Sequence, residues 1–250
     1  MLLNAIFDFS FPIKCSLCGT ILRNKSNNRL FCKECEEIIP EIYPFSVEIN
    51  SEKEGNSTRC RVCSRELISE IDICTICRKR KYYFSQNISL WDYNNYYIKT
   101  LIHNYKFKDK KKIASFFAHL ISDFYNNNID LKGIPVIPAP CSRKRIIKYG
   151  WDHMKYLSSI LSGKYFIKTF NVFKKKKTRD QKELDYEKRQ TALLNQIKVS
   201  ENNISKCLKI SNTAIFMDDV FTTGATANYC SKLLLDHGLK KVIVITLALD

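Results

Sequence analysis

The chain has 250 residues, and 45% of them are hydrophobic, which excludes a wholly disordered protein but leaves one large domain or two small ones open. Its 41 basic and 25 acidic residues give a formal net charge of +16, which favours a polyanionic partner such as nucleic acid, a pyrophosphate-bearing metabolite or an anionic membrane. Compositional drift toward Lys and Asn would explain the same charge, so charge alone excludes neither reading.

The N-terminal segment, residues 1–13, is apolar but is not expected to be a secretory signal. It carries Asp8 and lacks both a basic start and a cleavage site of small residues. No later stretch approaches the roughly 20 uncharged apolar residues of a membrane span. We therefore expect a cytoplasmic protein without membrane insertion.

The cysteines of the first third of the chain are regularly spaced. Eight of the eleven fall into four C-x-x-C pairs, Cys15/Cys18, Cys32/Cys35, Cys60/Cys63 and Cys74/Cys77. The turn of such a knuckle directs both thiolates to one centre, and two knuckles complete a tetrahedral S4 site. The spacing predicts a double zinc ribbon over residues 1–82, with structural zinc.

Other readings of these cysteines are weaker. Disulfides are disfavoured by the lack of a secretory signal, and a redox dithiol would need only one pair. Iron–sulfur ligation remains an alternative to zinc. The spacing does not decide which pairs share a metal, because pairing across the two ribbons is also open.

The basic run at 78–81 marks a domain boundary, and residues 83–250 are predicted to form the second domain. Apolar patterning then predicts a strand over 87–93, helices over 98–105 and 113–124, and a buried strand over 133–138. A further helix is expected to begin after Asp152 and to stop at Gly163. The polar stretch 168–190 is expected to be a solvated basic loop.

The last fifty residues have the clearest pattern. A strand over 213–217, a helix over 225–236 and a strand over 241–249 form a βαβ unit. Such a unit implies a parallel sheet, so the fold class is α/β.

The junction between the first of these strands and the helix carries the candidate ligand site. Asp218 and Asp219 end the strand, and a turn follows with Thr222, Thr223, Gly224, Ala225 and Thr226. A helix N-terminus offers unpaired N–H groups to a phosphate, and glycine lets the backbone approach closely. Carboxylates beside a phosphate site suit sugar hydroxyls, so the segment predicts a ribose 5-phosphate pocket.

Simpler interpretations explain less of this segment. A capped helix needs one Asp or Thr, and not two acids followed by Thr-Thr-Gly-x-Thr. A two-aspartate phosphatase would show Asp-x-Asp, and a Walker loop would show Gly-Lys-Ser/Thr. Both motifs are absent here.

The 214–226 segment resembles the phosphoribosyl-pyrophosphate motif of type-I phosphoribosyltransferases. The chain as a whole resembles the ComF family, competence-associated proteins that join a double zinc ribbon to a phosphoribosyltransferase-like domain. The resemblance extends from 11–12 through 105–107 and 137–140 to the C-terminus, and also includes Gln181, Leu184, Arg189 and Asn195.

The resemblance implies roles for particular residues. Asp218 and Asp219 would hold the ribose 2′- and 3′-hydroxyls, and residues 222–226 would wrap the 5′-phosphate. Arg145 and Lys106 would face the pyrophosphate and assist its departure. Magnesium would accompany phosphoribosyl pyrophosphate, bridging it to the ribose hydroxyls.

One segment departs from the family pattern. Where the family commonly has Arg-Gly-Phe-Asn-Gln, this chain has Tyr149-Gly150-Trp151-Asp152-His153. The Arg is lost and two amides become titratable groups, so turnover is in question. His153 is interpreted as a polar residue at a helix start in preference to a general base.

Two functions are therefore carried forward. The first is phosphoribosyl transfer, a pentosyl transferase reaction with an acceptor that the sequence does not identify, or sensing of the same ligand. The second is a non-catalytic module that uses the zinc ribbons and basic surface to bind single-stranded DNA or a DNA-uptake protein.

Overall fold

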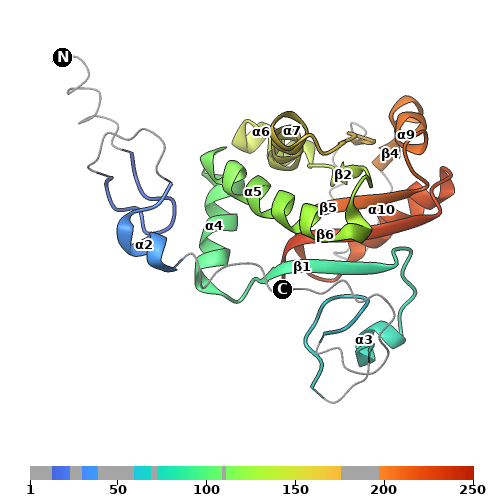
Figure 1. Ribbon diagram of the computed structural model, residues 1–250, viewed down its shortest axis with the longest axis horizontal. Helices are drawn as coiled ribbons and strands as arrows, with labels where there is room; N and C mark the ends of the chain where they lie inside the picture. Colours follow the sequence, from blue (N-terminus) through green and yellow to red (C-terminus); the bar gives the residue numbers. More distant parts are fainter. Residues whose placement is uncertain (1–12, 23–29, 39–58, 69–71, 109–110, 176–196) are drawn as a thin grey trace, which may run out of the picture.

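The computed structural model describes residues 13–22, 30–38, 59–68, 72–108, 111–175 and 197–250. The predictions for residues 1–12 and for Gln181, Leu184, Arg189 and Asn195 lie outside these ranges. The described chain is an α/β structure around a four-stranded, all-parallel sheet in the order β1-β6-β5-β2 (Figure 1). The strands are β1 (Gln86–Asp92), β2 (Val136–Pro138), β5 (Thr213–Phe221) and β6 (Lys241–Leu249). The predicted fold class is confirmed.

The two central strands are apolar on both faces, as parallel strands covered by helices require. In β5, Ile215 and Met217 belong to one hydrophobic cluster, whereas Ala214 and Phe216 belong to the other. Successive side chains of a strand point to opposite faces, so the two clusters are the two layers that cover the sheet.

Three helices cover the first face. They are α4 (Tyr96–Phe107), α5 (Lys111–Asn127) and α7 (His153–Tyr165). The predicted cap of α7 is confirmed, because Asp152 Oδ1 accepts a hydrogen bond from Lys155 N at 3.0 Å. The predicted stop at Gly163 is wrong: α7 continues to Tyr165 and ends at Phe166, which adopts φ 57°. A single glycine inside a packed helix costs only about 1 kcal/mol.

The second face is covered by α10 (Ala225–Asp236) and α9 (Glu201–Leu208). A small antiparallel pair, β3 (Phe173–Lys175) and β4 (Ile197–Val199), adjoins them. The stretch 168–190 was expected to be a loop, but its described part contains β3, and the rest lies outside the described residues. The short helices α6 (Arg143–Tyr149) and η2 (Ile129–Leu131) complete the α/β part.

The two cysteine-rich segments pack on opposite faces of this core. The first, with α2 (Lys33–Ile38), lies beside α4 (Figure 1), where Asn104 Nδ2 donates to Ser16 O at 2.8 Å. The second, with α3 (Thr75–Arg78), lies next to β1 (Figure 1), where Asn87 Nδ2 donates to Cys63 O at 3.1 Å. Both segments belong to the same hydrophobic clusters as the layers that cover the sheet, so they do not form a separate core. The domain boundary between residues 82 and 83 stays a prediction.

None of the helices within the described ranges combines the length and apolarity that crossing a membrane requires.

Candidate functional site

The eight paired cysteines form two separate four-sulfur clusters. Consecutive pairs combine, giving Cys15, Cys18, Cys32 and Cys35 in one cluster and Cys60, Cys63, Cys74 and Cys77 in the other. Cross-pairing between the ribbons, which the spacing left open, does not occur. Each cluster fits one ion of a double zinc ribbon.

The sulfur geometry suits a tetrahedral ion. Cys18 Sγ lies 3.6 Å from Cys32 Sγ, and Cys63 Sγ lies 3.8 Å from Cys74 Sγ. Zinc–sulfur bonds of about 2.3 Å place tetrahedral sulfurs roughly 3.8 Å apart. Backbone N–H groups also point at the sulfurs: Cys74 N donates to Cys60 Sγ at 3.3 Å. Such donors stabilise thiolates, which are the metal-binding form.

The two aspartates of the ligand motif lie at the carboxyl end of the central strand β5. The predicted strand ended at residue 217, but β5 continues to Phe221, because Val220 and Phe221 still pair with Ala248 and Leu249 of β6. Asp218 and Asp219 are therefore held in strand geometry with side chains on opposite faces. The carboxyl ends of strands are where ligands bind in open α/β sheets.

Asp219 is the centre of a buried polar cluster. Its Oδ2 lies 2.8 Å from Lys106 Nζ and 2.7 Å from His153 Nε2, and its Oδ1 accepts from Val220 N at 2.7 Å. The side chains of Asp219, Lys106 and His153 are only 10%, 11% and 3% exposed. The Tyr105 hydroxyl donates to the backbone oxygen of His153 and so fixes the start of α7.

The neighbouring Asp218 has a different environment. Its Oδ1 accepts from Asp219 N at 2.8 Å. Among the described residues, its Oδ2 has neither a hydrogen bond nor an ion-pair partner. This oxygen is the acceptor that a ligand hydroxyl would meet.

The two carboxyl groups are driven to different protonation states. Burial, and then the charge of Asp219, raise the pKa of Asp218 to about 7. Burial also acts to raise the pKa of Asp219, but the charge of Lys106 and the hydrogen bond from His153 outweigh it and leave that pKa below its ordinary value. Because two adjacent buried carboxylates repel, Asp219 stays ionised and Asp218 takes the proton first.

The turn after β5 leads into the N-terminus of α10, where Ala225 N donates to Thr223 Oγ1 at 3.4 Å. Gly224 is the N-cap residue of α10 and adopts φ 73°. An added Cβ there would lie 2.5 Å from Cζ of Phe221, so glycine is required both by the backbone and by the packed ring. Thr222 and Thr223 are exposed, while Ala225 and Thr226 begin the helix half-buried.

Arg145 lies on α6, the helix that follows the Pro138-Ala139-Pro140 segment. Ser142 caps this helix by accepting from Arg145 N at 3.3 Å, and the guanidinium lies 5.8 Å from the centre of the Phe107 ring. The positive charge of Arg145 acts to lower the pKa of Asp218, but the opposite effect of burial is larger, so that pKa is raised. The structure therefore brings Arg145 and Lys106 to the two aspartates.

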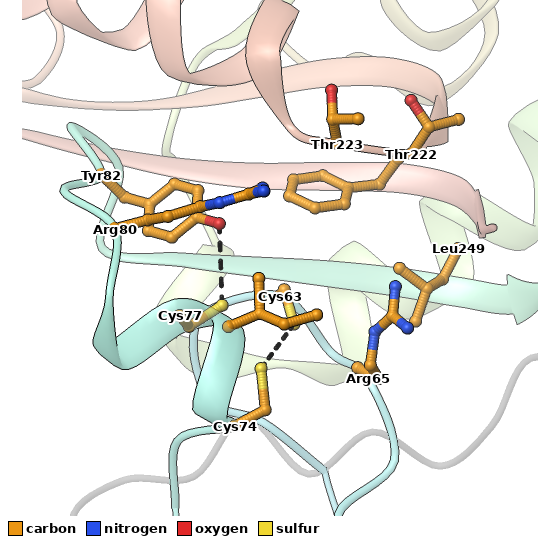
Figure 2. A pocket seen from close by; sticks show the side chains of 11 residues that line it. Cys63, Arg65, Cys74, Cys77, Arg80, Tyr82, Thr222, Thr223 and Leu249 are labelled. Carbon is orange, nitrogen blue, oxygen red and sulfur yellow. Dashed lines mark hydrogen bonds between the residues drawn. The ribbon is translucent and has the colours of Figure 1, made fainter.

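A cleft of about 200 Å³ separates the second cysteine cluster from the turn after β5. Exposed Arg65 and Arg80 lie along it with the aromatic rings of Tyr82 and Phe221. Figure 2 shows the hydroxyl oxygens of Thr222 and Thr223 pointing away from the cysteines, so these hydroxyls do not face the sulfur side of the cleft.

His153 is the residue whose importance sequence reasoning missed. It was placed correctly at a helix start, but it is 2% exposed and bonded to Asp219. The only signal was its position in the segment that departs from the ComF pattern. Nothing local in the sequence indicated that α7 would bring it against β5.

The chain is similar in sequence to a bacterial competence protein. Competence protein ComFC of Bacillus subtilis (strain 168) is 25% identical over 154 residues, which cover 61% of this chain and 59% of ComFC. The chain thus matches less than two thirds of that relative's length. No model of a known protein family matches the chain. The resemblance to the ComF family, predicted from the motifs, is confirmed by this distant relative and the two cysteine clusters.

Proposed function

We propose that the chain binds phosphoribosyl pyrophosphate, or a related sugar phosphate, at the junction of β5 and α10. The observation that carries this proposal is the succession of Asp218, Asp219 and the helix N-terminus at Gly224, all at the carboxyl end of a central parallel strand. Carboxylates beside backbone N–H donors match a ligand that has both hydroxyls and a phosphate.

The two aspartates have separate tasks in this proposal. Asp218 accepts from the ribose hydroxyls, because among the described residues its Oδ2 has no hydrogen bond or ion pair. Asp219 positions Lys106 and His153, to which its Oδ2 is already bonded. Residues 222–226 hold the 5′-phosphate, and Arg145 and Lys106 supply positive charge for the pyrophosphate.

The proposed cofactors follow from the donor groups. Each four-cysteine cluster holds structural zinc, because thiolates at tetrahedral spacing suit that ion. Magnesium prefers carboxylate, phosphate and water oxygens, and Asp218 is the carboxylate that offers one. When bound with the ligand, magnesium neutralises the charge of the pyrophosphate.

Phosphoribosyl transfer is consistent with this arrangement, since positioning and charge stabilisation are what such a reaction demands. A pocket that senses the ligand without turnover would use the same residues. The similar ComFC is named a competence protein. By analogy, we propose that either activity serves DNA uptake, on the cytoplasmic side.

Thermal unfolding with a ligand series tests the proposal. A ligand at 100 times its dissociation constant stabilises a protein by about 2.7 kcal/mol. Zinc-loaded protein should be stabilised more by phosphoribosyl pyrophosphate with Mg²⁺ than by ribose 5-phosphate. Arg145→Gln should remove that difference while keeping the response to ribose 5-phosphate. Arg143→Gln, on the exposed side of the same helix, should behave as wild type. No stabilisation of the wild type by either ligand would refute the proposal.

Single-stranded DNA binding is a second candidate, favoured by the cleft beside the second cysteine cluster. Arg65 and Arg80 lie there next to Tyr82, and basic grooves with aromatic rings bind single strands. Each lost phosphate contact should reduce the slope of log affinity against log salt by about 0.7. Fluorescence anisotropy with an oligothymidylate should show this for Arg80→Ala and not for exposed Lys240→Ala. Equal salt slopes for the two variants would argue against the cleft.

A further inference from the structure

A third group of metal-ligating side chains includes His153, the residue that also bonds to Asp219. Cys141, Asp152 and His153 each present a ligand atom, and these atoms lie within 4.8 Å of one another. Cys141 precedes α6, whereas Asp152 and His153 begin α7. The segment before α6 and the start of α7 thus bring a thiol, a carboxyl group and an imidazole together.

The hydrogen bond between His153 and Asp219 gives an independent reason to regard this group as a metal site. Its Nε2 lies 2.7 Å from Asp219 Oδ2, so Nδ1 carries the lone pair that remains for a metal. A histidine that ligates a metal almost always donates its other N–H to a carboxylate, a backbone carbonyl or water, which fixes the ring and its tautomer. Asp219 provides that carboxylate here, and the 2% exposure of His153 keeps the ring in place.

We propose that Cys141, Asp152 and His153 bind one zinc-class divalent cation. Thiolate and imidazole select zinc and similar ions over magnesium and calcium, which require oxygen ligands. Three protein ligands leave the fourth tetrahedral position open to water or to an oxygen of a bound molecule, as in catalytic zinc sites. This site therefore differs in kind from the two closed four-cysteine clusters.

The spacing of the three ligand atoms is close to that of a bound ion. Zinc with nitrogen, oxygen and sulfur ligands holds neighbouring ligand atoms roughly 3.3–3.8 Å apart, and these atoms lie within 4.8 Å of one another. Asp152 uses Oδ1 to cap α7, which leaves Oδ2 for a metal. Cys141 and Asp152 are partly exposed and give the ion access from solvent.

The proposal does not rest on sugar-phosphate binding, and it can be tested without any sugar phosphate.

The test is the zinc content of the full chain after dialysis against zinc-buffered solution, measured by mass spectrometry. We expect three zinc ions per wild-type chain, and two in Cys141→Ser, His153→Gln and Asp152→Asn. Asp152→Asn keeps a good helix cap, so its loss of zinc would not come from unfolding. The matched control is His119→Gln, in an exposed His119–Asp123 pair at 3.6 Å, which should retain three.

A second measurement identifies the thiolate. Protein whose four-cysteine clusters are filled with zinc is titrated with Co²⁺, and wild type and His119→Gln should develop a thiolate-to-cobalt charge-transfer band. Cys141→Ser should not. Two zinc ions in the wild type, or a third ion that persists in both Cys141→Ser and His153→Gln, would overturn the proposal.

Discussion

The buried ion pair between Lys106 and Asp219 should make a large contribution to stability. The two charged atoms are 2.8 Å apart, and the side chains are 11% and 10% exposed. Lys106→Met keeps the length and apolar stem of the side chain but removes its charge. Of the described residues, His153 then remains the only partner of Asp219 Oδ2, next to the carboxyl group of Asp218.

Removing one partner of a buried ion pair typically costs 3–5 kcal/mol, because the other charge is left uncompensated. His153 still bonds to the same oxygen, so we expect a loss of about 2–3 kcal/mol. In a chain of this size 1 kcal/mol shifts the midpoint of thermal unfolding by about 2–4 °C. Lys106→Met should therefore lower the midpoint by about 4–12 °C.

Differential scanning calorimetry of zinc-loaded protein at pH 8 measures this shift. The matched control is Lys232→Met, which breaks an exposed pair with Asp236 at 3.3 Å, with side chains 48% and 52% exposed. Exposed helix pairs contribute about 0.3–0.5 kcal/mol, so the control should move by less than about 2 °C. A midpoint for Lys106→Met that matches the control would refute the reasoning.

Three further perturbations have defined outcomes. Burial and the neighbouring charge raise the pKa of Asp218 to about 7, above an unfolded value of about 3.9. The native state therefore loses stability as pH rises from about 4 to about 7, and the loss is complete above 7. Asp218→Asn should unfold at a higher temperature than wild type at pH 8, with a smaller excess at pH 5.5. Gly224→Ala should lower the free energy of unfolding by about 2 kcal/mol or more in chemical denaturation, because Gly224 has a positive φ and an added Cβ would meet Phe221. Its control, Gly163→Ala, lies in open space within a helix and should raise the free energy of unfolding by about 0.5–1 kcal/mol. Cys74→Ser should contain one zinc ion fewer by mass spectrometry. It should also lower the midpoint of thermal unfolding, because the cluster of Cys74 shares a hydrophobic core with Phe221. An unchanged midpoint would show that the second ribbon is not part of that core.

The strongly patterned elements were predictable from the sequence. Helix 225–236 and strand 241–249 match α10 and β6, because caps and apolar runs are local signals. The predicted strand 213–217 was too short. The residues after 217 include polar ones, which end an apolar pattern, but β5 continues through them because they pair with β6. The predicted helix end at Gly163 was wrong for a related reason, because the packing of α7 on the sheet outweighs the weak tendency of glycine to interrupt a helix.

The candidate site was predictable in part. The motif identified Asp218, Asp219 and the turn, and the resemblance added Lys106 and Arg145. The sequence did not indicate that Asp219 is already bonded to Lys106 and His153, which makes Asp218 the aspartate with an available oxygen. That difference arises from the docking of α4 and α7 on β5, and no local pattern encodes it.

The most direct test of the account is titration calorimetry with phosphoribosyl pyrophosphate and Mg²⁺. Wild type and Asp236→Asn, an exposed control, should show saturable binding at one site per chain. Asp218→Asn should fold, keep its zinc and lose most of that binding. Absence of binding by folded, zinc-loaded wild type, or undiminished binding by Asp218→Asn, would contradict the assignment of the pocket.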